Sequence, residues 1–255
     1  MSFPLRLIAA ASVLFSLSNL AGAAELKIVG GSAIEPVMKL LVPGFESASG
    51  HRVVVDFNAA IGEMTARVQR GEFADVVIVS GAQIDALEKS GRVTSGSRTD
   101  LAKVGVAVFV RKGAPKPDVG NVEAFRRAML DAKSIGYNDP AAGAPVSLYL
   151  IGLFDRLGIG EPMKLKTVAF KQRSERFGAV ARGDVEIGFN QVSEIIAVPE
   201  VDLVGPLPAE IQNYTLFAAG VVNDTKEPEA ARAFIRYVSS PENRPIWKER
   251  GFEAP

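Results

Sequence analysis

The side chains in this sequence that best suit the binding of a small molecule are hydrogen-bond donors. Ser32 follows two glycines, Asn58 precedes two alanines, and Gln191 ends an apolar run. Hydroxyl and amide groups of this kind donate hydrogen bonds to anions. Arg173 and Arg176 add guanidinium groups, which hold a carboxylate through two parallel hydrogen bonds. These residue types favour an anion-binding site.

Each of these residues also suits an ordinary structural role. Ser32 stands where a helix is expected to begin, and serine is a preferred N-cap residue. The glycines before it allow a close backbone approach, which packing can require as well as a ligand. Gln191 suits an exposed strand end, and most arginines are solvated. The residues alone leave both interpretations open.

Two carboxylates, Glu63 and Glu194, are the candidates for a general base, because each lies close in sequence to one of these segments. Proton abstraction next to a carboxylate needs such a base, together with donors that stabilise the developing charge. Asp75 and Asp139 are better explained as turn and strand-end residues. No distinctive motif surrounds either glutamate.

Several other chemistries lack the residues they need. The 255 residues include no cysteine and one histidine, His51, which excludes thiol nucleophiles and weakens Ser-His-Asp catalysis and zinc binding. No phosphate-binding glycine motif follows a predicted strand. The 29 basic residues balance 29 acidic ones, so nothing indicates nucleic acid or a membrane surface as partner. We expect neither a metal nor a cofactor.

The elements that position these residues alternate short β-branched runs with longer amphipathic stretches, which is typical of α/β proteins. Strands are expected over residues 26–31, 52–57, 74–80, 104–111, 133–139, 167–170, 185–191 and 215–222. Helices are expected over residues 32–47, 61–69, 83–89, 122–132, 148–157, 174–182 and 228–238. Pro43 is expected to break the first helix before its end, and 202–208 is read as a connecting segment.

The order strand, helix, strand, helix, strand occurs twice, and this repetition predicts two similar lobes. Residues 24–103 and 212–255 are assigned to lobe one, and residues 104–211 to lobe two. The chain then crosses between the lobes twice, which makes a hinge. Ligands of open α/β sheets bind outside the carboxyl ends of the strands, so the two lobes define one cleft between them.

The first 23 residues have the features of a secretory signal peptide: a basic start, an apolar stretch and a small-residue ending at Ala23. Polar residues interrupt the apolar run, which is therefore short for a membrane helix. We expect cleavage after Ala23 and export to a bacterial periplasm. Because no cysteine is present, no lipid anchor is expected.

Four stretches carry a resemblance to a known family: GGSAIEPVMKLLVPGFESASGHRVVVDF, RGEFADVVIVSGAQIDALEKSGRV, YNDPAAGAPVSLY and RGDVEIGFNQVSEI. Together they resemble the molybdate-binding branch of the periplasmic solute receptors that serve ABC importers. The resemblance covers nearly the whole mature chain. It implies a two-lobed type II periplasmic-binding-protein fold with two doubly wound mixed sheets, a permease as partner, and a monomer.

The resemblance also implies an anion cleft formed by loops of both lobes. Ser32 matches the family's first binding serine, and Tyr149 matches the aromatic residue that closes the Asp-Pro loop. Val146 and Ser147 stand at the positions of backbone donors just before that tyrosine.

This chain departs from the family pattern at two of the loops. Ala60 and Ile61, with the alanine before them, replace a second serine-rich loop, and Gln191 replaces the binding tyrosine of the second lobe. The pair Ser193-Glu194 is kept. Small first-lobe residues, an amide and arginines suit a larger or flatter organic anion, such as a di- or tricarboxylate.

Two functions follow from this pattern. The first is a receptor that captures a small anion, an organic carboxylate or an oxyanion such as molybdate, for an ABC importer. The second is an enzyme on the same scaffold, because the resemblance extends to bacterial aconitate isomerase, which shifts a double bond in an unsaturated tricarboxylate. Glu63 or Glu194 would then act as the base, and exchange of ligand hydrogen with solvent separates the two functions.

Overall fold

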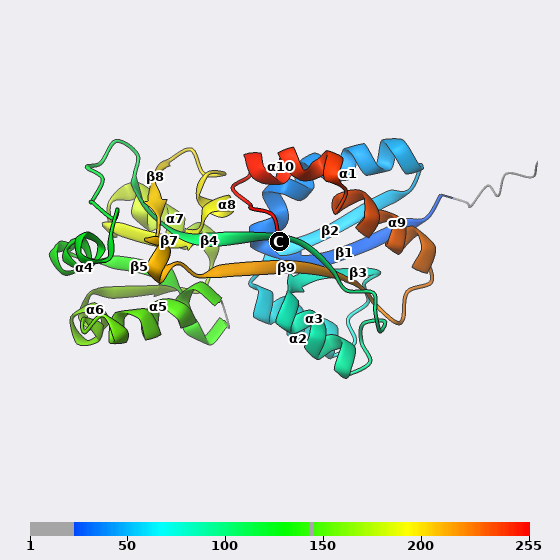
Figure 1. The fold of residues 1–255 in the computed structure, drawn as a ribbon, viewed down its shortest axis with the longest axis horizontal. Coiled ribbons are helices and arrows are strands. Elements are labelled where there is room, and N and C mark those ends of the chain that lie inside the picture. The colour runs from blue at the N-terminus through cyan, green and yellow to red at the C-terminus, as the bar shows by residue number, and fades with distance from the viewer. Residues whose placement is uncertain (1–22, 143–144) are drawn as a thin grey trace, which may run out of the picture.

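The computed structural model describes residues 23–142 and 145–255, which form two lobes side by side along the long axis of the molecule (Figure 1). The predicted signal peptide lies outside the described residues, apart from Ala23. The α/β fold with two lobes is as predicted.

The strands that form the two lobes are β1 (Glu25–Gly31), β2 (Arg52–Ala59), β3 (Val76–Ser80), β4 (Thr99–Arg111), β5 (Ile135–Asn138), β6 (Thr167–Phe170), β7 (Ile187–Gln191), β8 (Val201–Pro206) and β9 (Tyr214–Val221). The α-helices are α1 (Glu35–Ser49), α2 (Ile61–Gln69), α3 (Gly81–Lys89), α4 (Val122–Asp131), α5 (Pro145–Arg156), α6 (Gly160–Lys166), α7 (Arg173–Arg182), α8 (Val192–Ile195), α9 (Pro228–Val238) and α10 (Arg244–Glu249). A 3-10 turn, Ser32–Ile34, separates β1 from α1.

One long strand, β4, belongs to both lobes. In lobe one, β1 pairs in parallel with β2 and β3, and β9 pairs antiparallel with β3. The first half of β4 pairs antiparallel with β9, and its second half pairs antiparallel with β7 and β8. β5 then pairs in parallel with β7 and β6. The hydrogen-bonded ladder is therefore continuous through the hinge, in the order β2-β1-β3-β9-β4-β7-β5-β6.

The return crossing is the segment between β8 and β9, and the side chain of Gln212 fixes it to β4. Its Oε1 accepts a hydrogen bond from the Val106 N–H at 2.8 Å, and its Nε2 donates one to the Val106 carbonyl at 3.0 Å. The side-chain amide thus pairs with a backbone peptide as a neighbouring strand would. Both crossings lie side by side at Val106.

The core of lobe two lies on both faces of its strands. Side chains from α4, α5 and α6 pack with Val106, Val108 and Phe189 on one face. On the other face, Phe177 of α7 stacks on Phe109 of β4 with ring centroids 4.7 Å apart. Figure 1 shows α7 and α8 on the opposite side of β7 from α5 and α6.

The first helix runs past Pro43 instead of breaking there. It ends at Ser49, and Gly50 takes the left-handed conformation, with φ 74°, that terminates it. Pro43 has no N–H to donate to the carbonyl four residues before it. Because Pro43 lies on the exposed side of the helix, that carbonyl can bond to water instead. The Ser47 hydroxyl donates to the Pro43 carbonyl at 2.8 Å. A proline on the solvent side of an amphipathic helix therefore removes one backbone hydrogen bond, which water can replace.

Sequence reasoning missed four short elements, of which α10 is the last, and misread the length of one strand. The segment expected to be a connection is strand β8, and α6 and α8 had no periodic signal because they span 7 and 4 residues. β4 starts at Thr99, five residues before its expected start.

A cluster of charges on lobe one gives a test of the fold by pH. Arg67 Nε donates to Glu72 Oε2 at 2.6 Å, and Arg67 also pairs with Asp56 at 2.7 Å. The hydrogen bond from Arg67 lowers the pKa of the Glu72 carboxyl to about 2. A carboxyl whose pKa is lowered by folding stabilises the protein above its unfolded pKa and loses that effect as the pH falls.

We therefore expect Glu72→Gln to destabilise the protein at neutral pH, and we expect the difference from wild type to shrink as the pH drops from about 4.5 to about 2. Urea unfolding at a series of pH values measures this difference. Glu229→Gln is the control, since Glu229 is exposed and its arginine partner stands 3.9 Å away. A difference that stays constant across that window would contradict the pairing.

Candidate functional site

A hydrogen bond between Ser32 and Glu194 joins the lobes at their facing strand ends. Ser32 follows β1 in lobe one, and its Oγ donates to Glu194 Oε1 of α8, in lobe two, at 2.9 Å. No side chain caps the 3-10 turn that Ser32 begins. The N-cap interpretation of Ser32 is therefore wrong, because its hydroxyl points across the interface.

Arg173 makes a second connection between the lobes. It is the first residue of α7, and its guanidinium contacts Glu35 of α1 at 3.2 Å and Glu194 at 3.4 Å. Glu194 is 4% exposed, so two donors from different lobes stabilise a buried carboxylate. Arg173 lies at the lobe interface, where it pairs with two protein carboxylates, and its role toward a ligand stays a prediction.

Beside this network lies a group of buried donors that have no partner. They are Asn190 Nδ2, Gln191 Nε2, Ser193 Oγ and all three guanidinium nitrogens of Arg176. In the part of the chain that the structure describes, they make up six of the seven buried side-chain polar atoms without a hydrogen bond. Leaving one buried donor unpaired costs about 1–3 kcal/mol, so six such atoms on β7 and on the adjoining helices α7 and α8 indicate a site that lacks its acceptors.

The elements explain how these donors come together. Asn190 and Gln191 end β7, and Ser193 lies in α8, which starts directly after that strand. Asn190 is paired in register with Ala107, on the sheet face that α7 covers. Arg176 lies on the buried stripe of α7 with Phe177 and Val180. The carboxyl end of β7 therefore meets α7 and α8 at the interface between the lobes.

Arg176 is the charged member of this group of donors. Its side chain is 1% exposed, and burial lowers the pKa of its guanidinium to about 10, while the charge of Glu194 acts in the opposite direction. Its terminal carbon lies 5.3 Å from the centroid of the Phe177 ring. It remains protonated at neutral pH.

Several predicted residues have other contacts in the structure. The Tyr149 hydroxyl donates to the Ile211 carbonyl at 2.8 Å, which ties α5 to the return crossing. Val146 is buried in the core of lobe two, and Ser147 is fully buried on the same helix. The roles of these three residues toward a ligand stay predictions.

The first-lobe loop after β2 is placed by packing. Asn58 is exposed, with its N–H 3.4 Å from Asp56 Oδ1, and Ala60 is the N-cap of α2. Ile61 is buried, and a Cβ on Gly31 would lie 2.5 Å from its Cγ1. The glycine is therefore needed for the contact between β1 and α2, whatever the ligand. Within the described ranges, none of these three residues makes a hydrogen bond to the unpartnered donors of β7.

The two candidate bases differ in environment. Glu63 lies exposed in the first turn of α2, and no hydrogen bond or ion pair holds it. Glu194 is buried beside Ser32 and Arg173. Of the two, Glu194 lies with the unpartnered donors.

Sequence reasoning missed part of this site. Asn190, Ser193 and Glu35 were not singled out as ligand contacts, and Arg176 was not preferred over Arg173. The available signal was position, since Asn190 and Ser193 flank Gln191 at the end of a strand, and Arg176 shares a helix face with Phe177.

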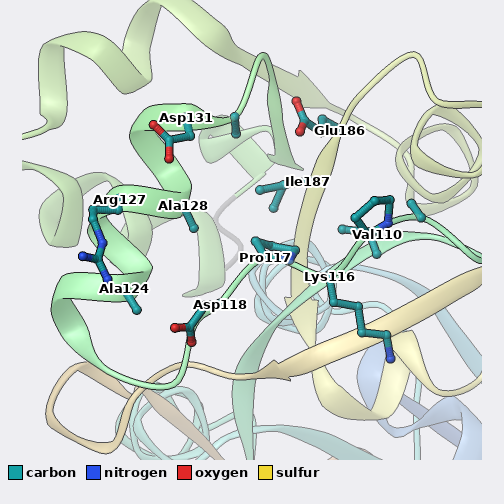
Figure 2. Close-up of a pocket in the computed structure, with 13 residues that line it drawn as sticks. Val110, Lys116, Pro117, Asp118, Ala124, Arg127, Ala128, Asp131, Glu186 and Ile187 are labelled. Atoms are coloured by element: carbon teal, nitrogen blue, oxygen red, sulfur yellow. The ribbon is translucent and has the colours of Figure 1, made fainter.

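A separate hollow of about 440 Å³ lies between α4 and the segment after β4 (Figure 2). Charges of both signs line it, from Lys116, Asp118, Arg127, Asp131 and Glu186. It includes Ile187, at the amino end of β7, and so lies away from the strand ends that carry the donors. It contains none of the predicted site residues.

Residues 23–142 and 145–255 lack two further features. Within these ranges no three His, Cys, Asp or Glu side chains are grouped so that they would hold a metal ion. In the same ranges no helix combines the length and apolar character needed to cross a membrane.

Comparisons with known proteins show which family this chain resembles. The family model described as bacterial extracellular solute-binding protein matches residues 26–253. The chain is 36% identical over 220 residues to the aconitate isomerase of a Pseudomonas species, covering 84% of this chain and 82% of that protein. It is 25% identical over 260 aligned residues to the molybdate-binding protein of Azotobacter vinelandii, covering 99% of each.

Solved structures show the same fold. The periplasmic molybdate-binding protein of Azotobacter vinelandii matches with a TM-score of 0.76 and 20% identity, covering 90% of this chain and 99% of that chain.

The bond between the lobes gives a prediction for Ser32→Ala. This substitution leaves the buried Glu194 carboxylate with Arg173 alone, so the ligand-free protein should lose about 1–3 kcal/mol of unfolding free energy in urea. Ser95→Ala is a matched control, because Ser95 also donates to a glutamate, Glu88, at 2.8 Å, but on an exposed loop. Its effect should stay within about 0.5 kcal/mol. Equal effects of both variants would contradict the bond between the lobes.

Proposed function

Because the chain belongs to the family of bacterial extracellular solute-binding proteins, we propose that it is a periplasmic receptor that closes its lobes over a small anion and presents it to an ABC importer. The observation that carries this proposal is the group of buried, unpartnered donors on Asn190, Gln191, Ser193 and Arg176. Each of them needs an acceptor, and an anion supplies several acceptors at once.

The hinge supports a receptor that opens and closes. Two neighbouring crossings, β4 and the segment held by Gln212, connect the lobes. Because the crossings lie side by side, the lobes can rotate about them as about a hinge. The polar contacts between the lobes, from Ser32 to Glu194 and from Arg173 to Glu35, are ones that water can replace on opening. A ligand that bridges both lobes would shift the population toward the closed form.

The ligand is proposed to be an organic carboxylate or an oxyanion such as molybdate. Relatives of this chain are named for molybdate and for the isomerisation of aconitate. The loop after β2 offers Ala60 and Ile61, which carry no hydroxyl. This favours a carboxylate over a tetrahedral oxyanion that must be enclosed by donors from both lobes.

A second candidate function is a double-bond isomerase, favoured by the 36% identity to an aconitate isomerase and by the buried Glu194. In this reaction a base removes a proton from the carbon next to a carboxylate, and the double bond shifts as a proton is returned to the other end of the allylic system. No oxidant or reductant is consumed. The buried donors would stabilise the charge that develops on the substrate carboxylate.

The receptor proposal predicts that anions stabilise the mature protein, residues 24–255. A thermal-shift screen would include molybdate, tungstate, sulfate, phosphate, and di- and tricarboxylates with both aconitate isomers. A bound ligand at a hundred times its Kd stabilises the folded state by about 2.7 kcal/mol, which shifts Tm clearly. If no anion raises Tm, the protein does not bind anions in this way.

The isomerase candidate predicts exchange with solvent. Either aconitate isomer, incubated with the protein in deuterated water, should incorporate deuterium and convert to the other isomer, as followed by proton NMR. Glu194→Gln should abolish both changes, and Glu63→Gln, on the exposed helix face, should keep them. Tight binding with full retention of ligand protons would contradict the isomerase and leave only the receptor proposal.

A further inference from the structure

We propose that Arg176 is the anchor for one carboxylate group, so that the ligand is an organic acid and not a compact tetrahedral oxyanion. This inference rests on the proposed anion site between the lobes and deepens it by naming the residue that binds the carboxylate and so selects an organic acid.

The first argument is that Arg176 is a buried charge that makes no hydrogen bond or ion pair. Its side chain is 1% exposed, and none of its three nitrogens has a hydrogen-bond partner. Taking a charge out of water costs several kcal/mol, unless it is paired and its donors are satisfied. The ring of Phe177, 5.3 Å away, supplies a cation–π contact but no acceptor. An anion bound to Arg176 would pair the buried charge and satisfy its donors, and so would offset this cost.

The second argument is that the neighbouring carboxylates are already engaged. Glu194 accepts from Ser32 at 2.9 Å and contacts Arg173 at 3.4 Å. Glu35 contacts Arg173 at 3.2 Å and Lys39 at 2.8 Å. Arg173 is thus neutralised by protein groups, and Arg176 is the cation of this network that is left for a ligand.

The third argument concerns charge and shape. A guanidinium presents a planar fork that matches the two oxygens of a carboxylate. One carboxylate brings one negative charge to Arg176, which makes no ion pair, and its further acceptor sites suit Asn190 Nδ2 and Ser193 Oγ. A compact dianion would bring two charges close to the buried Glu194 carboxylate, and like charges repel strongly where water is excluded. Additional carboxylates of an organic acid can lie farther away.

The protonation of Arg176 fits this role. Burial lowers the pKa of the guanidinium to about 10, so it keeps its charge at neutral pH. The same burial removes competing water from the bond it would form.

The test compares Arg176→Met with Arg182→Met, an exposed arginine of the same helix. Unfolding of the ligand-free proteins and titration calorimetry with citrate, succinate, both aconitate isomers, molybdate and sulfate are measured. We expect Arg176→Met to raise Tm without ligand, because methionine fills the site with no buried charge. We expect its affinity for the carboxylates that bind wild type to fall about tenfold to a hundredfold, while Arg182→Met behaves as wild type.

The outcomes separate this inference from the receptor proposal. Wild type that binds molybdate or sulfate but no carboxylate keeps the anion site and overturns the role of Arg176, as does an Arg176→Met variant with wild-type carboxylate affinity. If wild type binds none of these anions, both proposals fail. If Arg176→Met does not fold, Arg176→Lys decides, because it keeps the charge and loses the fork: a fall of at least about tenfold in affinity supports the anchor, and unchanged affinity overturns it.

Discussion

The strand β4 carries the hydrogen-bonded ladder of both lobes within 13 residues. Its first half pairs with β9 and its second half with β7 and β8, and Gln212 adds side-chain bonds to Val106 where the two halves meet. This continuity determines where the end of β7 lies relative to the end of β1. Ser32 and Glu194, 162 residues apart in the chain, meet for this reason.

The interface between the lobes is governed by the cost of burying charge. Glu194 is stabilised by a hydroxyl from one lobe and a guanidinium from the other, and Arg173 is shared between two carboxylates. Arg176, Asn190, Gln191 and Ser193 remain without acceptors in the same region. Binding sites often carry such local instability, because the groups that bind a ligand are arranged for it and not for the free protein. The receptor and the isomerase would use the same donors and differ in whether Glu194 transfers a proton.

Close packing and hydrogen bonds within the protein explain several residues that the sequence analysis first related to a ligand. A Cβ on Gly30 would lie 2.4 Å from the Ile78 carbonyl, and one on Gly31 would lie 2.5 Å from Ile61. Both glycines are required where β1 meets β3 and α2. Tyr149, placed by resemblance at the cleft, donates its hydroxyl to the return crossing. Residue type and position alone do not separate these roles, because glycines and tyrosines serve both.

The sequence by itself determined the alternation of strands and helices, the two lobes and the segments at the strand ends, because these follow from local hydrophobic periodicity and turn residues. It missed α8 and β8, which have short or weak patterns, and misplaced the end of the first helix, because Pro43 faces solvent. Only the tertiary structure decided which of two arginines three residues apart is neutralised and which is not. Arg173 reaches carboxylates of both lobes, and Arg176, one helical turn later, is buried against the sheet, where its nitrogens have no hydrogen-bond partner. The carboxylates that pair with an arginine come from distant parts of the chain, so the local sequence pattern cannot predict them.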